Sequence, residues 1–230
     1  MWRLGSLSLL LLAAAALGAC DGSPNGDVTA GQGDSQTVNG SVRVPAGQHS
    51  GAVGTVNGSV NIGDNASVGT ARVVNGPIEM GAHSSASSLT AVNGSIDVAS
   101  GAQVSGAIKS VNGAVTLASG SDVTGSVTNV NGHITLNDAH VGGGLRTVTG
   151  DIDVKGSSKV EGGILVEKPV SSFFNTESTR KPRIVIGPGA VVQGNLKFER
   201  EVQLYVSDKA TVGPVEGATA VTFSGDTPPG

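Results

Sequence analysis

A short motif of valine, asparagine and glycine returns at nearly constant spacing along this chain, and this period constrains the fold more than any other feature. The steps between successive copies are 18 or 19 residues. The asparagines of the six copies are Asn39, Asn57, Asn75, Asn93, Asn112 and Asn131. A seventh copy, at Thr149-Gly150, keeps the valine and the glycine but not the asparagine. Such a period indicates repeats that each form one structural unit and stack on their neighbours.

Within one repeat, apolar residues alternate in short runs that are divided by glycine-containing corners. In the copy that begins at Val92, these residues are Ile96 and Val98, then Ala102 and Val104, then Ile108. Alternation over so few residues between Gly corners predicts three short strands per repeat. The sequence therefore predicts an all-β fold, a single-stranded parallel β-helix of about nine coils with 18–20 residues each, with the right-handed form favoured.

One coil could not hold this shape alone. Its five or so inward apolar side chains contribute roughly 1.5–3 kcal/mol each on burial. Ordering about 18 residues costs roughly 1.5 kcal/mol per residue. Stacked coils add backbone ladders about 4.8 Å apart and a continuous apolar interior. We therefore expect Val92, Val111 and Val130 to lie one above another along a common axis.

The first 19 residues have the features of a targeting segment. Arg3 supplies a positive start, and an apolar run follows from Leu4 to Gly18. The run ends in Leu17-Gly18-Ala19-Cys20, and Cys20 is the one cysteine of the chain. This ending resembles the bacterial lipoprotein signal, in which lipid is attached to the cysteine and cleavage occurs before it. Ordinary cleavage after Ala19 would place bulky Leu17 where a small residue is preferred.

The remaining chain divides by its periodicity. Residues 20–37 have no apolar period and are expected to form a flexible tether behind the lipidated Cys20. Residues 38–223 are expected to form the β-helix, and residues 224–230 a short tail. Residues 167–182 interrupt the rhythm, which resumes at Ile184, so they are expected to be a loop inserted at a corner.

The inserted segment combines aromatic and basic residues, and two interpretations remain open for it. Its two phenylalanines could fold back and cover the flank of the stack. Alternatively, the segment is a partner-binding loop, since insertions in solenoids tend to carry recognition. The residues of that hypothesis are Phe173, Phe174, Arg180 and Lys181.

The corner asparagines also have two structural interpretations. Each could be a left-handed turn residue, or the side-chain amides could bond up the stack as a ladder. Both interpretations assign the asparagines to structure rather than to ligand binding.

Signals for catalysis or for cofactors are weak throughout. The four histidines (His49, His83, His133 and His140) fall at different phases of the repeat, so we do not expect them to stack into a metal site. Asp151 and Asp153 flank Ile152 on an outward face, with Asp97 and Glu79 at equivalent phases. Aligned carboxylates could form a polysaccharide-cleaving site, but solvated surface acids are the commoner explanation. Charged residues are 14% of the chain and its net charge is −4, so no footprint for nucleic acid is visible.

Two family resemblances cover about residues 38–223. The stretch IVIGPGAVVQGNL resembles the bactofilins, bacterial polymer-forming proteins with a right-handed β-helix core, and the VNGSI-type repeats resemble exported putative-adhesin proteins. IGPGA is also similar to the hexapeptide repeat of left-handed β-helix acyltransferases, but the longer Asn-Gly-marked coil argues against that family. Two departures from the bactofilins matter. Bactofilins are typically cytoplasmic, whereas this chain has an export signal, and the aromatic residues of the C-terminal coil could block polymerisation through end contacts.

Together these features predict an exported, lipid-anchored structural or adhesin-like protein of the bacterial cell envelope, without enzymatic activity, metal or cofactor. We expect it at the inner or outer membrane, facing the periplasm or the surface. Expected partners are the membrane, through the lipid on Cys20, and an envelope polymer or protein. The alternatives are a bactofilin-like polymer-forming protein that self-associates and an enzyme acting on envelope polysaccharide through Asp151 and Asp153.

Overall fold

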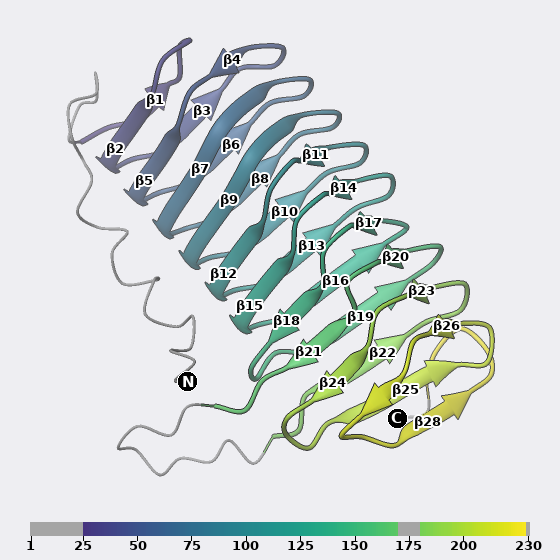
Figure 1. The fold of residues 1–230 in the computed structure, drawn as a ribbon. Coiled ribbons are helices and arrows are strands. Elements are labelled where there is room, and N and C mark those ends of the chain that lie inside the picture. Colours follow the sequence, from purple (N-terminus) through teal and green to yellow (C-terminus); the bar gives the residue numbers. More distant parts are fainter. Residues whose placement is uncertain (1–24, 170–179, 229–230) are drawn as a thin grey trace, which may run out of the picture.

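The computed structural model describes residues 25–169 and 180–228, and every regular element in these ranges is a β-strand. The strands stack as an elongated parallel solenoid, from β1 at one end to β28 at the other (Figure 1). The fold class predicted from the repeat is therefore confirmed. One face carries eleven strands, which are separated by ten turns, close to the nine predicted coils. The described residues contain no helix, and so none that could cross a membrane.

Each full coil contributes a strand to three faces. The strands of the first face are β1 (Val28–Thr29), β3 (Val42–Val44), β6 (Val60–Ile62), β8 (Ile78–Met80), β10 (Ile96–Val98), β13 (Val115–Leu117), β16 (Ile134–Asn137), β19 (Ile152–Lys155), β22 (Arg183–Ile186), β25 (Gln203–Ser207) and β28 (Ala220–Phe223). The second face contains β4 (His49–Ser50), β11 (Gln103–Val104), β14 (Asp122–Val123), β17 (His140–Val141), β20 (Lys159–Val160), β23 (Val191–Val192) and β26 (Thr211–Val212). The third face contains β2 (Ser35–Asn39), β5 (Val53–Asn57), β12 (Ile108–Asn112), β15 (Val127–Asn131), β18 (Leu145–Thr147), β21 (Ile164–Val166), β24 (Leu196–Phe198) and β27 (Val215–Glu216). Two long strands, β7 (Ser67–Asn75) and β9 (Ser85–Asn93), run through both the second and the third face.

All strand pairs are parallel and in register, so like positions of successive coils form columns. Ile96 pairs with Val115, which pairs with Ile134, and all three side chains are fully buried. The apolar positions predicted from the repeat are buried in the same way. Because the residues on both sides of Val92, Val111 and Val130 pair from coil to coil, these valines lie one above another, as expected. They face outward and are half-buried.

The corner glycines are required by how closely the coils stack. A Cβ added to Gly94 would overlap the backbone carbonyl of Gly76 in the preceding coil, and the same clash recurs along the corner column. Gly76 also has a φ of +137°, a backbone conformation that residues with a side chain rarely adopt. The residue with positive φ at this corner is thus the glycine and not the asparagine before it. The asparagines lie in strands, where Asn93 pairs with Asn112.

The stack begins earlier than its apolar pattern indicated. β1 pairs with β3, and β2 pairs with β5, although β1 lies within the segment expected to be a flexible tether and β2 begins in it. The tether prediction is therefore wrong for residues 25–37. The physical reason is that the inward residues of β2 are Ser35 and Thr37, which are buried but polar and leave no apolar period to detect.

The inserted segment occupies the corner between β21 and β22, at the position that Asn131-Gly132 takes two coils earlier. Of the expected tail, residues 224–228 are described and contain no strand, and Ser224 Oγ donates a hydrogen bond of 2.6 Å to Asp208.

Candidate functional site: a charged cluster at one corner of the stack

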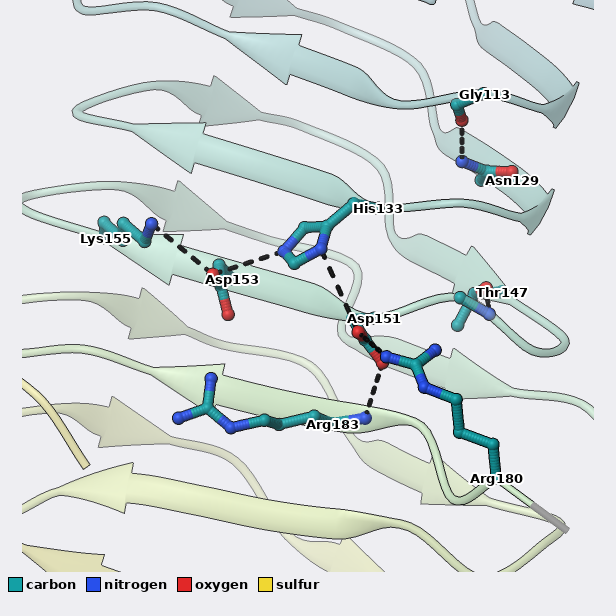
Figure 2. A network of polar contacts seen from close by, with 10 residues as sticks. Gly113, Asn129, His133, Thr147, Asp151, Asp153, Lys155, Arg180 and Arg183 are labelled. Atoms are coloured by element: carbon teal, nitrogen blue, oxygen red, sulfur yellow. Dashed lines mark hydrogen bonds and ion pairs between the residues drawn. The ribbon is translucent and has the colours of Figure 1, made fainter. Parts of the chain in front are cut away.

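The carboxylates singled out from the sequence lie where the inserted segment rejoins the solenoid. His133, Asp151 and Arg183 each stand at the same position just before or at the start of β16, β19 and β22, so they stack in one column. We call the set His133, Asp151, Asp153, Lys155 and Arg180 the corner cluster (Figure 2). The side chains of Asp151 and Asp153 are each only 12% exposed, so they are not the solvated surface acids of the commoner explanation.

Asp153 binds two basic side chains on the outer surface of the first face. Its Oδ2 lies 3.2 Å from Nε2 of His133, one coil away, and 3.4 Å from Nζ of Lys155 on its own strand. Its Oδ1 is buried without a hydrogen-bond partner among the described residues. A buried carboxylate needs such partners, because burial strongly disfavours an unpaired charge.

The pairing moves both titrating groups toward their charged forms. The hydrogen bond to Asp153 raises the pKa of His133 above the ordinary imidazole value, although burial acts in the opposite direction. Burial opposes ionisation of Asp153, but the hydrogen bond from His133 and the charges of His133 and Lys155 outweigh it, so the pKa of Asp153 is lowered. The two groups therefore form an ion pair at pH values between the pKa of Asp153 and that of His133.

Asp151 joins the solenoid to the far end of the inserted segment. Its Oδ1 accepts a hydrogen bond of 2.8 Å from the backbone N–H of Arg183, and its Oδ2 pairs with the guanidinium of Arg180. Nδ1 of His133 lies 4.0 Å from the same Oδ2. Next to Arg180, Nζ of Lys181 lies 2.8 Å from Oε2 of Glu201. Arg180 and Lys181 thus bind the stack itself.

Arg200 completes this junction from the following coil. Its Nη1 donates a hydrogen bond of 3.1 Å to the carbonyl of Val148, and its Nη2 donates one of 3.2 Å to the carbonyl of Arg180. The first carbonyl belongs to the corner between β18 and β19, and the second lies just before β22. The other two residues of the loop hypothesis, Phe173 and Phe174, lie outside the described residues, as does Cys20.

This arrangement is better suited to holding structure than to acid–base chemistry. A general acid that protonates a leaving group at neutral pH needs a raised carboxyl pKa, whereas that of Asp153 is lowered. Asp151 is occupied by a guanidinium and a backbone N–H. Among residues 25–169 and 180–228, no group of three or more His, Cys, Asp or Glu side chains could hold a metal ion.

The histidine phases read from the sequence need correction. His49 and His140 belong to one column of the second face, which runs through Ser67, Ser85, Gln103 and Asp122. Five coils separate the two histidines along this column, so they cannot share a ligand. The shared phase was obscured by the corner residue that is lost between Asn137 and His140.

A second charged cluster escaped the sequence analysis altogether. Nδ1 of His140 pairs with Asp122, its Nε2 lies 3.3 Å from Glu161, and Lys159 lies 2.7 Å from the same carboxylate. The hydrogen bond to Asp122 raises the pKa of His140. These residues succeed one another in adjacent coils, so aligning the repeats by their inward residues would have revealed them.

The corner asparagines form a continuous ladder of side-chain amides. Nδ2 of each donates to Oδ1 of its counterpart one coil earlier, over 2.9 Å from Asn57 to Asn39 and 3.0 Å from Asn93 to Asn75. The ladder weakens to 3.5 Å at Asn131 and ends at Thr149, whose hydroxyl donates to Asn131 over 3.2 Å. At its other end it includes Asn25, which accepts from Asn39.

An inward polar column beneath this ladder was also missed. In several coils it places a hydroxyl or amide against the corner of the preceding coil, as when Oγ1 of Thr55 donates to the carbonyl of Gly40 over 2.8 Å. Nδ2 of Asn129 likewise donates to the carbonyl of Gly113 over 2.7 Å. In two other coils the position is taken by Val73 and Ala91. Each of these residues immediately precedes the repeated valine, where the template assigned no inward side chain.

Comparison with protein-family models, with curated proteins and with solved structures finds no match for this chain.

Proposed function

We propose that this protein is an exported, lipid-anchored and non-catalytic scaffold of the bacterial cell envelope, whose long faces serve as binding surfaces. The export and anchoring parts are supported by the apolar segment that ends in Leu17-Gly18-Ala19-Cys20. The resemblance of the VNGSI-type repeats to exported putative adhesins agrees with this location. The continuous, regular faces of the solenoid favour a scaffold or binding role.

The observation that carries the non-catalytic part is the pairing within the corner cluster. Asp151 and Asp153 are the best-placed carboxylates for cleaving an envelope polysaccharide, and both are neutralised by neighbouring cations. Asp151 fastens the end of the inserted segment to the stack, and Asp153 binds His133 of the preceding coil. An enzyme acting on polysaccharide is therefore the weaker alternative.

Mass spectrometry of the mature N-terminus tests the anchoring. We expect Cys20 to be the first residue, to carry lipid, and to bring the protein into the membrane fraction, whereas Cys20→Ser leaves it unlipidated. An unmodified Cys20 in the mature wild-type protein would contradict the proposal.

A second candidate function is bactofilin-like polymerisation through the ends of the stack. Within the described residues, β1 pairs only with β3 and β28 only with β25, so each terminal strand has one edge without a paired strand. Analytical ultracentrifugation of the purified protein distinguishes this function. Concentration-dependent long assemblies would support it, and a monomer at high concentration would exclude it.

A further inference from the structure

The third face carries an unusual combination of side chains on its outer surface. Two outward columns run along it, and the repeated valines form one of them: Val38, Val56, Val74, Val92, Val111, Val130 and Val148. All seven are half-buried, and because the strands that carry or precede them pair in register they form a continuous apolar stripe. The exposed asparagine ladder borders the stripe along the corner.

From Arg72 to Arg146, the second outward column contains a basic residue in every other coil. Arg72 pairs with Thr90, which pairs with Lys109, and Thr128 then separates Lys109 from Arg146. Because stacked strands lie about 4.8 Å apart, these cations repeat at about 10 Å along the solenoid axis. This is the length of one extended disaccharide unit.

The cations are free to bind a ligand in the part of the face that precedes the inserted segment. Among the described residues, Arg72 and Lys109 are exposed and make no ion pair, whereas Arg146 pairs with Glu167 over 2.9 Å. The outward positions of the third face from Gln36 to Val148 contain no acidic residue. The face is therefore electropositive on a protein whose net charge is −4.

The asparagine ladder leaves hydrogen-bonding capacity in each rung. A side-chain amide has two N–H donors and an oxygen with two lone pairs, and the ladder uses one donor and one lone pair. Each interior rung therefore offers one donor and one acceptor to solvent at the coil spacing. The rungs between Asn39 and Asn112 have bonds of 2.9–3.0 Å, so their amide planes are held in place.

We infer that the third face binds a linear anionic polysaccharide with one carboxylate in each disaccharide, extended along the solenoid axis. Its carboxylates pair with Arg72 and Lys109, its hydroxyl and amide groups bond the asparagine ladder, and its apolar ring faces pack on the valine stripe. An extended peptide does not fit this spacing, because its side chains on one face repeat at about 6.7 Å. The inference rests on the proposed function and names the class of envelope polymer bound.

Titration calorimetry with the full chain in detergent tests the inference, using a hyaluronan oligosaccharide of ten sugars as the probe. We expect binding that weakens as salt rises, since exposed charges are screened. A chitin oligosaccharide, which is neutral, and poly-L-glutamate, which is anionic without sugars, should each bind about tenfold more weakly. Equal binding of poly-L-glutamate would overturn the inference, and so would equal binding of the chitin oligosaccharide or no binding of hyaluronan.

Charge variants make the test specific to this face. Arg72→Gln with Lys109→Gln should weaken hyaluronan binding about tenfold, the effect of losing two exposed ion pairs. The matched control, Arg43→Gln with Lys209→Gln, removes one exposed arginine and one exposed lysine elsewhere and should bind as the wild type does. Equal loss in both pairs would show that only net charge matters and would overturn the inference.

A rearranged variant tests the spacing itself. Thr90→Lys with Lys109→Thr keeps the composition and net charge but moves one cation to the coil next to Arg72. We expect it to bind several-fold more weakly than the wild type while its circular dichroism stays unchanged, and equal affinity would overturn the assigned repeat. Failure of these binding tests leaves the lipidation of Cys20 untouched, so the two proposals fail separately.

Discussion

Nε2 of His133 lies 3.2 Å from Oδ2 of Asp153, although the two residues belong to different coils. Their contact exists only when β16 and β19 are stacked in register. A change in the interaction between His133 and Asp153 therefore indicates a change in the stacking of these coils, and it can be measured as a function of pH.

Stability should depend on pH through this pair. Because folding raises the pKa of His133, its contribution is fully present below the ordinary imidazole value of 6.5 and is lost as pH rises through the folded value. The pKa of Asp153 is lowered, so its contribution is present above its ordinary value and is lost as pH falls through the folded one. At about pH 5 both contributions are present.

A double-mutant cycle measures this dependence. We expect His133→Gln and Asp153→Asn to show a coupling of about 0.5–1 kcal/mol at pH 5, small because His133 is partly exposed. The coupling should be clearly smaller at pH 9, where His133 is neutral and keeps at most a hydrogen bond to Asp153. Urea unfolding of the four proteins at both pH values provides the measurement, and a coupling that is equal at the two values would contradict the assignment.

Gly94→Ala should destabilise the protein by about 2–3 kcal/mol or more, because the added Cβ overlaps the carbonyl of Gly76 and forces two coils apart. Gly31→Ala is the control, since a Cβ there meets nothing within 4 Å. Urea midpoints compare the two variants. Similar midpoints for both would mean that the corner column tolerates a side chain.

The amide ladder can be tested at Asn93, which donates to Asn75 and accepts from Asn112. Asn93→Ala removes both bonds and should cost about 1 kcal/mol, since the bonds are exposed. Asn93→Asp keeps an acceptor for Asn112 but lacks the donor for Asn75 at neutral pH. Its stability relative to the wild type should therefore recover below pH 4, where the protonated carboxyl can donate.

The inward polar column contains a matched pair of residues. Oγ of Ser110 is buried without a hydrogen-bond partner among the described residues, so Ser110→Ala should leave stability unchanged or raise it by about 1 kcal/mol. Thr55→Val removes a hydroxyl that bonds the carbonyl of Gly40 and should lower stability by about 1 kcal/mol. Thermal unfolding of both variants checks the contrast. Equal effects would show that the two hydroxyls have equivalent surroundings.

Most of the fold could be predicted because the residues that determine it recur at a regular period. Inward apolar residues such as Ile96 and Ile108 recur at fixed offsets from the repeated valine, and stacking is the arrangement that buries them all. The first coil was missed because Ser35 stands where the next coil has Val53, and the other inward residue of β2, Thr37, belongs to the polar column. An apolar template cannot detect a strand whose inward side chains are hydroxyls.

The corner cluster was only half predictable. Asp151 and Asp153 attracted attention as neighbouring acids, but their partners come from other coils and from beyond the inserted segment. His133 could have been found, since it precedes Ile134 as Asp151 precedes Ile152. Arg180 could not, because the inserted segment before it does not follow the repeat and so gives Arg180 no position in it.

The early start of the solenoid limits how far the protein could stand from a membrane. Its first bridge, between Asn25 and Asn39, lies five residues after Cys20. Five residues reach at most about 18 Å, even fully extended. A lipid on Cys20 would therefore hold the first coil close to the lipid headgroups. The solenoid would begin at the bilayer surface and would not be separated from it by a long linker.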